Sequence, residues 1–294
     1  MAAGVSAVLA TAVGWAAARP AAATGAPVAI GRADLRVVTA PGQPRGEAPG
    51  GFGVLQLNLC NSGWAPCYRE LNRGRAVAEA YRQVVALRPD LVTLNEVCRA
   101  DVFDRLLPAL ARGWPGDRVY AAFEPARERT GGPVRCADGD EYGIGVLGRV
   151  PAATWLGAVA FGATYPDSRT PDGGTTQDAG SREERAWLCV YAVANYLGCT
   201  THLANADGVV AANQCRYLLG RVVPALWRRQ AIVPTVVGGD LNLDSDRTCL
   251  PGWWFGRRDG EVQHVLANSP PSGTRRIALA HTDHPAWLVT LSRW

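Results

Sequence analysis

The hydrophobic positions of this chain follow two periodicities, and together they predict a protein of mixed strands and helices. Short apolar runs bounded by polar or glycine-rich stretches are typical of buried strands, whereas apolar positions three or four apart are typical of helices. Strands are predicted at residues 53–59, 91–97, 119–123, 143–147, 159–161, 232–237, 261–267 and 287–291, with a hairpin over 186–203. Helices are predicted at residues 75–87, 101–111 and about 210–229, and Pro224 is a point where the last helix could bend.

The order of these elements predicts an α+β fold. Many strands with connections of varied length, interrupted by a few helices, favour a sandwich of two β-sheets with helices on the outer faces. The alternation is not regular enough for a βαβ barrel, and the chain contains neither a GxGxxG nor a GKS/GKT phosphate loop. No internal repeat is visible, so we expect one domain over residues 51–294.

The N-terminal composition predicts a secreted protein. Residues 2–18 form a run of Ala, Val, Leu and Gly, and a small-residue stretch follows at 21–26, as in a signal peptide over residues 1–23. Residues 24–50, rich in Pro, Gly and Ala, are interpreted as a linker with an edge segment. The first arginine is Arg19, so the positive start of a signal peptide is missing and an Ala-rich disordered leader is the alternative. The run is short and weakly apolar for a membrane span of roughly 20 residues.

The cysteines support the same compartment. There are eight, none in a CxxC pair, which argues against a zinc ribbon or a thioredoxin motif and favours disulfides in an oxidising environment. Cys60 and Cys67 bracket a short loop, and Cys189 and Cys199 flank a predicted hairpin turn, so both pairs are placed to bond. The other two bridges would come from Cys98, Cys136, Cys215 and Cys249, with some free buried thiols as the alternative.

Net charge adds little to this picture. The formal charge is +4, and every basic residue is arginine. This mild excess is compatible with a polyanionic substrate but lies far from the density of a histone.

The most informative residues are polar ones at the ends of apolar strands. Asp240 and Asn242 follow a buried run and lie two positions apart, so their side chains project from the same face. Asn58, Glu96 and His202 end other apolar runs, where a polar side chain is costly unless it is paired or bound to a metal. Carboxylates, amides and imidazoles that converge in this way suit a hard cation and an acid–base group. The sequence therefore predicts a hydrolase.

Five motifs in order carry a family resemblance. They are QLNLCN at 56–61, TLNEV at 93–97, CTTHL at 199–203, VVGGDLNLD at 236–244 and HTDHPAWLV at 281–289. This set resembles the endonuclease/exonuclease/phosphatase superfamily, which includes deoxyribonuclease I, abasic-site endonucleases, bacterial sphingomyelinases and inositol-polyphosphate phosphatases. The resemblance extends over residues 53–294. It implies a four-layered sandwich of two mostly antiparallel sheets flanked by helices, and metal-assisted hydrolysis of phosphate esters.

The resemblance also implies roles for individual residues. Asn58, Glu96 and Asp283 correspond to the environment of the divalent metal, and oxygen donors of this kind suit Mg²⁺ or Mn²⁺. Asp240 corresponds to the carboxylate that orients or activates the attacking water, and Asn242 to the group that binds the phosphate or fixes that carboxylate.

His202 and His284 correspond to the pair that contacts the scissile phosphate, stabilises the developing charge and assists protonation of the leaving group. Glu141 corresponds to a carboxylate that orients His202, although a solvated loop glutamate is the favoured interpretation. Gln263 stands where the family usually has the aspartate that holds His284. Its carbonyl could accept the imidazole N–H but supplies no charge to favour the imidazolium.

Three further candidates concern substrate contact. Arg182 or Arg185 corresponds to a phosphate-binding arginine, with a plain surface arginine as the alternative, and Asn61 is a third candidate. The aromatic run at residues 253–255 is interpreted as packing, with a substrate- or membrane-contacting loop as the alternative.

Together these observations predict a secreted, Mg²⁺- or Mn²⁺-dependent phosphodiesterase that acts as a monomer without a stable protein partner. Extracellular nucleic acid is the favoured substrate, and an endonuclease the favoured activity. A sphingomyelinase-like phospholipase C acting on membrane lipid, or an inositol-phosphate phosphatase, shares the same catalytic residues and differs in its substrate loops. A non-catalytic binding module on a degenerate scaffold is a third alternative, supported only by Gln263.

Overall fold

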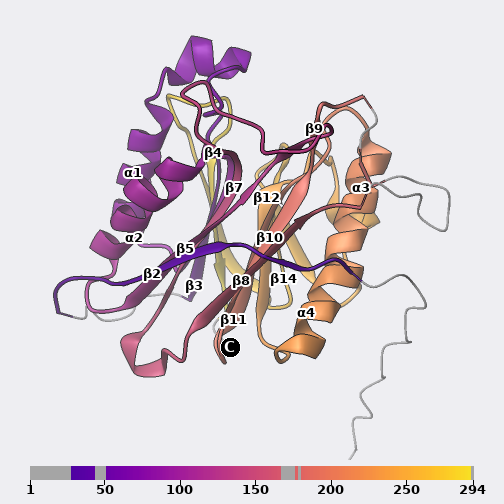
Figure 1. Cartoon of the computed structure of the whole chain (residues 1–294). Coiled ribbons are helices and arrows are strands. Elements are labelled where there is room, and N and C mark those ends of the chain that lie inside the picture. Colours follow the sequence, from indigo (N-terminus) through magenta and orange to yellow (C-terminus); the bar gives the residue numbers. More distant parts are fainter. Residues whose placement is uncertain (1–27, 44–50, 167–175, 178–179, 293–294) are drawn as a thin grey trace, which may run out of the picture.

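The computed structural model describes residues 28–43, 51–166, 176–177 and 180–292. In this part of the chain, two seven-stranded sheets pack face to face, and helices cover both outer faces (Figure 1). This is the four-layered α+β sandwich that the sequence predicts. The predicted signal peptide over residues 1–23 lies outside the described residues.

The first sheet has the strand order β1-β8-β10-β11-β12-β14-β13. All its neighbouring pairs are antiparallel except β11 and β12, which are parallel. The strands are β1 (Gly31–Arg32), β8 (Ala158–Thr164), β10 (Ala186–Ala192), β11 (Tyr196–His202), β12 (Thr235–Asp240), β13 (Phe255–Arg258) and β14 (Gln263–Ala267).

The second sheet has the order β15-β16-β3-β4-β7-β5-β2, and its single parallel pair is β3 with β4. Its strands are β2 (Asp34–Thr39), β3 (Phe52–Asn58), β4 (Leu91–Cys98), β5 (Arg118–Pro125), β7 (Tyr142–Val150), β15 (Pro271–Ile277) and β16 (Ala286–Leu291). Two short strands, β6 (Arg127–Glu128) and β9 (Glu183–Glu184), pair separately. The sheets are thus mostly antiparallel, as predicted.

The helices lie where the apolar spacing places them. In the first connection, η1 (Tyr68–Asn72) and α1 (Ala76–Leu87) precede β4, and η2 (Asp101–Leu106) runs into α2 (Leu107–Gly113). The predicted helix over 210–229 is one continuous helical run made of α3 (Gly208–Tyr217), η4 (Leu218–Val222) and α4 (Val223–Arg229). Pro224 lies at the start of α4, directly after the π-helical turn η4. Single 3₁₀ turns occur at η3 (Ala152–Thr154) and η5 (Asp246–Thr248).

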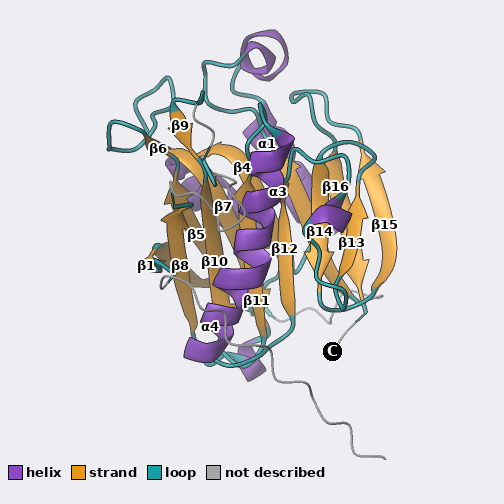
Figure 2. Cartoon of the chain, turned by 90° about the vertical axis from the view of Figure 1, so that its right-hand side faces the viewer, coloured by secondary structure: helices purple, strands orange, loops and turns teal. Residues whose placement is uncertain are grey.

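Three apolar layers hold the four layers of elements together. Leu57, Leu94 and Leu110 belong to the layer between the second sheet and α1 and α2. Trp187 and Leu226 belong to the layer between the first sheet and α3 and α4, the helices in front of the strands in Figure 2. The middle layer joins the two sheets, with Val54, Leu188 and Val236 among its members. The central strands are buried on both faces for this reason, and they read as continuous apolar runs.

Besides the two-residue strands β1, β6 and β9, three strands were not predicted from the pattern. β2 lies within the segment interpreted as linker with an edge segment, and it forms an edge of the second sheet. β13 and β15 are also edge strands, and most of their residues are exposed. Exposed edge strands lack the alternation that marks a half-buried strand, which explains why the pattern did not reveal them.

All eight cysteines form disulfides. The predicted Cys60–Cys67 and Cys189–Cys199 bonds are both present. The remaining bonds are Cys98–Cys136 and Cys215–Cys249, so the alternative of free thiols is excluded. Four disulfides agree with an oxidising location. Among the described residues, the helices are all too short or too polar to cross a membrane.

Candidate active site

The two parallel pairs bring the polar strand ends together. β3, β4, β11 and β12 all end at the same edge of the sandwich, because the strands of a parallel pair run in one direction. His202 lies beside Asp240 in the register of the first sheet, and Asn58 lies beside Asn95 in the second. The loop that precedes β16 adds Asp283 and His284 at this edge.

These side chains project between the sheets because of strand alternation. Val236 belongs to the middle apolar layer, so Asp240, four residues later, projects from the same face. By the same alternation, Asn58 of β3 projects from the same face as Val54, and Asn95 of β4 projects from the same face as Leu91. Each central strand therefore changes from apolar to polar along the face that meets the other sheet.

Left-handed backbone conformations shape the site at two of its residues. Glu96 has φ +53° and lies in a bulge of β4, between Leu94 and Val97. Asn242 has φ +50°. Such conformations are uncommon for residues other than glycine, and a bulge redirects the side chain that it carries.

An amide joins the two buried carboxylates. The Asn58 Nδ2 atom donates to Glu96 Oε1 at 2.9 Å and to Asp240 Oδ2 at 3.0 Å. The pKa of Glu96 is raised to about 7, mainly by burial and to a smaller extent by the nearby Asp240 charge, while the hydrogen bond from Asn58 acts in the opposite direction. Burial also raises the pKa of Asp240, although His284 and Asn58 act in the opposite direction. The charged forms of both carboxylates are thus short of compensating positive charge.

Asn242 supports Asp240 through its backbone. Its N–H donates to Asp240 Oδ1 at 3.1 Å, and its side-chain amide donates to the Leu203 carbonyl at 2.9 Å. In the structure, Asn242 therefore fixes both the carboxylate and the end of β11. The resemblance implies that Asn242 either binds the phosphate or fixes Asp240. The structure shows the contact with Asp240.

Arg185 orients His202. The Arg185 Nη1 atom lies 2.9 Å from His202 Nδ1 and 3.0 Å from Glu183 Oε1. Because arginine only donates, Nδ1 is the acceptor and the ring proton sits on Nε2. That Nε2 faces the carboxylate cluster, 3.9 Å from Glu96 Oε1. Burial, together with the charges of Arg185 and His284, holds the pKa of His202 well below its usual range, so the ring is neutral.

His284 approaches the same cluster from the loop before β16. Its Nε2 lies 3.6 Å from Asp240 Oδ2 and 3.8 Å from Asp283 Oδ1. Its Nδ1 is buried without a hydrogen-bond partner among the described residues. The Asp283 side chain is about half exposed, at the open side of the cluster.

Neither of the two groups considered for orienting these histidines contacts its imidazole ring. Gln263 does not hold the His284 ring, because Gln263 Oε1 accepts from the Asn58 N–H and its Nε2 donates to the Pro285 carbonyl at 2.6 Å. Gln263 thus fixes the backbone next to His284 instead. Glu141 does not orient His202, since its carboxylate faces Arg99 at 3.7 Å.

The structure also separates the three candidates for substrate contact. Arg185 reaches the cluster, whereas Arg182 is exposed and lies further out. Asn61 is buried away from the cluster, and its amide group donates to Asp101 Oδ2 at 2.7 Å and accepts from Asn72. Asn61 therefore has a structural role, and its assignment to substrate contact is corrected.

Sequence reasoning missed a polar layer behind the site. Asn95 Oδ1 accepts from the Asp240 N–H and from Gln56 Nε2, both at 2.7 Å, so it joins the two sheets directly beneath the Asp240 carboxylate. Thr93 donates to Gln56 at 2.6 Å. The available signal was a polar residue two positions before Asn58 and two positions before Asn95, on the same face of the strand in each case.

The donor set fits a hard divalent cation. Glu96, Asp283 and the Asn58 amide offer oxygen ligands, and no described residue gives a hydrogen bond from a cationic group to the Glu96 or Asp240 carboxylate, although both have raised pKa values. Mg²⁺ is commonly held by one or two carboxylates, with water and substrate phosphate as its other ligands. The described residues contain two tighter groups of three candidate ligands, but disulfide sulfurs supply two members of each.

Comparison with known proteins identifies the fold. No protein-family model matches the sequence, and no curated protein matches it. Among solved structures, an endonuclease/exonuclease/phosphatase from Bacteroides vulgatus is similar with a TM-score of 0.54 at 14% identity, covering 83% of this chain and 99% of that one. The Bacteroides thetaiotaomicron mannosyl-6-phosphatase is similar with a TM-score of 0.51 at 14% identity, covering 82% of this chain and 99% of that one. The human Nocturnin catalytic domain with bound sulfate is similar with a TM-score of 0.52 at 14% identity, covering 88% of this chain and 96% of that one.

Proposed function

We propose that this chain, which has the endonuclease/exonuclease/phosphatase fold, is a secreted divalent-metal-dependent phosphodiesterase that hydrolyses extracellular nucleic acid. Residues 51–294 would form the catalytic domain and residues 1–23 the leader. The observation that carries the proposal is the contact of Asn58 with both Glu96 and Asp240, while His202 and His284 lie within 4 Å of those carboxylates.

The residues divide the chemistry as follows. Asp240 accepts the proton of the attacking water, and its raised pKa makes it a stronger base than an exposed carboxylate. Asn242 and Asn58 hold the two oxygens of that carboxylate in a fixed direction. A bound Mg²⁺ or Mn²⁺, held by Asn58, Glu96 and Asp283, would neutralise phosphoryl charge as a Lewis acid.

The histidines stabilise the phosphate. Neutral His202 presents its Nε2–H to the cluster, so it acts as a hydrogen-bond donor to a phosphoryl oxygen. His284 lies with its Nε2 3.6 Å from Asp240 Oδ2 and is placed to give a proton to the leaving oxygen.

One structural feature weighs against the phospholipase alternative. The aromatic run at residues 253–255 leads into β13, whose first residue pairs with Ala267 at the end of β14. The site lies at the opposite end of β14, where Gln263 pairs with Asp240. Trp254 is buried, and Trp253 packs against Trp227. These aromatic residues therefore do not form a membrane-contacting loop beside the site.

A substrate panel with metal control tests the proposed function. The mature protein is incubated with DNA, RNA, sphingomyelin vesicles and inositol phosphates, in Mg²⁺, in Mn²⁺ and in EDTA. We expect cleavage of nucleic acid in either metal, loss of cleavage in EDTA, and recovery when metal is returned. Cleavage that persists in EDTA, or faster hydrolysis of another substrate, contradicts the proposal. Salt-sensitive DNA binding without any strand breaks would instead support a binding module.

A further inference from the structure

A cavity of about 730 Å³ opens beside the catalytic cluster. It shares Glu96, Arg185 and His202 with that cluster, so a ligand in the cavity would lie next to the scissile phosphate. Its outer lining includes Trp64 and Arg182. The volume is within the range typical of binding sites for small molecules or single substrate groups.

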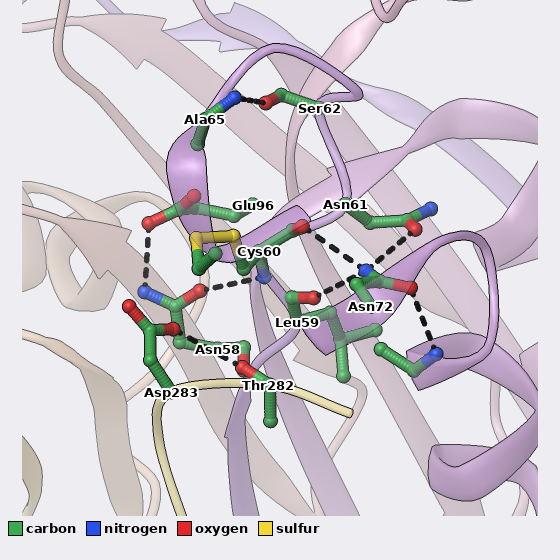
Figure 3. The surroundings of a disulfide bond; sticks show 12 residues. Asn58, Leu59, Cys60, Asn61, Ser62, Ala65, Asn72, Glu96, Thr282 and Asp283 are labelled. Atoms are coloured by element: carbon green, nitrogen blue, oxygen red, sulfur yellow. Dashed lines mark hydrogen bonds between the residues drawn. A yellow bond between two sulfur atoms is a disulfide. The ribbon is translucent and has the colours of Figure 1, made fainter. Parts of the chain in front are cut away.

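Two disulfide-closed loops build the outer wall of this cavity. The Cys60–Cys67 bond closes the loop that carries Trp64, and it lies beside Asn58, Glu96 and Asp283 (Figure 3). The Cys98–Cys136 bond anchors the second loop to the end of β4.

Direct hydrogen bonds join these two loops. The Ala137 N–H donates to the Ser62 carbonyl at 2.8 Å, and Trp64 Nε1 donates to the Arg135 carbonyl at 3.1 Å. The wall is therefore formed by covalently closed loops that are bonded to each other.

Trp64 presents an open aromatic face on this wall. Its side chain is 64% exposed, and its only polar atom is already bonded to Arg135. It makes no ring contact with another aromatic residue of the described chain, unlike Trp253, which is 56% exposed but packs against Trp227 and Trp254. An exposed indole that is held by its edge is suited to stacking against a planar group.

Three guanidinium groups, of Arg135, Arg182 and Arg185, and three carboxylates line the cavity, and one of the guanidinium groups is available to an anionic ligand. The Arg182 guanidinium forms no hydrogen bond or ion pair with the described residues, so it is available to a ligand. Of the carboxylates on the lining, Glu96 belongs to the catalytic cluster and Glu183 is paired with Arg185. Glu128 accepts from Thr130 at the rim. The lining thus has as many guanidinium groups as carboxylates, and it offers no net negative charge to the quaternary ammonium group of a choline head group.

We propose that this cavity binds the nucleobase of the nucleotide next to the scissile phosphate, with the base stacked on Trp64 and Arg182 in contact with the neighbouring phosphate. This inference rests on the proposed function, because it names the part of the substrate that the cavity holds. Stacking on an aromatic side chain is tolerant of sequence. The cavity would therefore distinguish a nucleotide with a base from an abasic one, but it would not distinguish one base from another.

Cleavage of paired substrates tests the inference. Each oligonucleotide has one natural diester flanked by methylphosphonate linkages, and its partner carries a tetrahydrofuran abasic residue on the 5′ or the 3′ side of that diester. We expect wild type to prefer the base-containing substrate on one side, and Trp64→Ala to lower kcat/KM for it about 10- to 100-fold while leaving the abasic substrate unchanged. Trp64→Phe should keep most of the preference for the base-containing substrate. Trp253→Ala, the matched control, should keep all of that preference.

A binding measurement separates this inference from the proposed function. Calorimetry compares thymidine 3′,5′-bisphosphate with its abasic analogue, neither of which contains a diester. Wild type should bind the nucleoside form at least about tenfold more tightly, and Trp64→Ala should remove the difference. Base-dependent binding without nucleic acid cleavage would contradict the proposed function but support the cavity. Cleavage without a base preference, or equal losses on both substrates in Trp64→Ala, would overturn the inference.

Discussion

At the scale of single residues, the Asn58 amide links the two carboxylates of the candidate active site. Its two N–H groups bond to Glu96 and Asp240, and its carbonyl accepts from the Cys60 N–H. The two carboxylates are thus held close together although burial disfavours their charged forms. An arrangement that keeps two destabilised carboxylates side by side is typical of a catalytic site rather than of a stabilising ion pair.

The variant Asp240→Asn tests the role of the base. It retains the size of the side chain but cannot accept the proton of water, so we expect the rate of phosphodiester cleavage to fall about 10²- to 10⁴-fold with an unchanged circular dichroism spectrum. Asp244→Asn, an exposed carboxylate four residues further along, should keep wild-type activity. A variant at Asp240 that kept more than a tenth of the activity would remove this residue from the mechanism.

At the scale of elements, the disulfides serve two different purposes. Cys60–Cys67 spans seven residues and shapes the loop beside the site, whereas Cys215–Cys249 spans 34 residues and ties α3 to the loop after η5. A longer closed loop removes more conformational freedom from the unfolded chain. The shorter bond therefore stabilises less, but it lies where a change of backbone affects Asn58.

Removing each bond in turn should show this division. The double variant Cys215→Ser with Cys249→Ser should lower the free energy of unfolding by about 4 kcal/mol with little change in kcat/KM, because the bond lies outside the cluster and the cavity. The double variant Cys60→Ser with Cys67→Ser should lower the free energy of unfolding by only about 2 kcal/mol. It should nevertheless reduce kcat/KM about tenfold, since both Asn58 and Trp64 adjoin that loop. Urea unfolding and initial rates measure the two effects, and equal losses of activity would contradict the division.

At the scale of the whole molecule, the packing of the two sheets places polar groups in the interior. Asn95 crosses from the second sheet to the Asp240 backbone in the first, and both residues lie in the buried space between the sheets. Glu124 of β5 is also buried on the inner face of its sheet, against Gly162 of β8. No described residue donates a hydrogen bond to its carboxylate, so its charged form weakens the contact between sheets.

This predicts a pH dependence of global stability. Burial raises the pKa of Glu124 from 4.5 to about 7 in the folded protein. Between these values the folded protein holds a proton that the unfolded chain has lost, so stability falls as the pH rises from 4.5 through 7. Glu124→Gln should therefore be more stable than wild type at pH 8, by on the order of 1–3 kcal/mol, with a smaller difference at pH 4.5. Urea unfolding at both pH values measures this, with the exposed Glu128→Gln as control. If Glu124→Gln were more stable than wild type by the same amount at both pH values, ionisation of Glu124 would not be the cause of the difference in stability.

The sequence alone predicted the sandwich, the helices, two disulfide pairs and most of the polar residues that meet at the strand ends. These depend on local periodicity, because alternation along each strand decides which side chains share a face and where an apolar run ends in Asn58 or Asp240. The exposed edge strands β13 and β15 carry no such alternation, and the pattern did not find them.

Only the tertiary structure decided between residues that are equivalent in sequence. It chose Arg185 over Arg182 for the contact with His202, used the Asn61 amide inside the scaffold, and directed Gln263 to the Pro285 carbonyl. It also made a cavity from two loops that lie far apart in the chain. The reason is that a hydrogen bond such as that from Asn58 to Asp240 spans 182 residues. Its formation depends on how two sheets pack, which local periodicity does not determine.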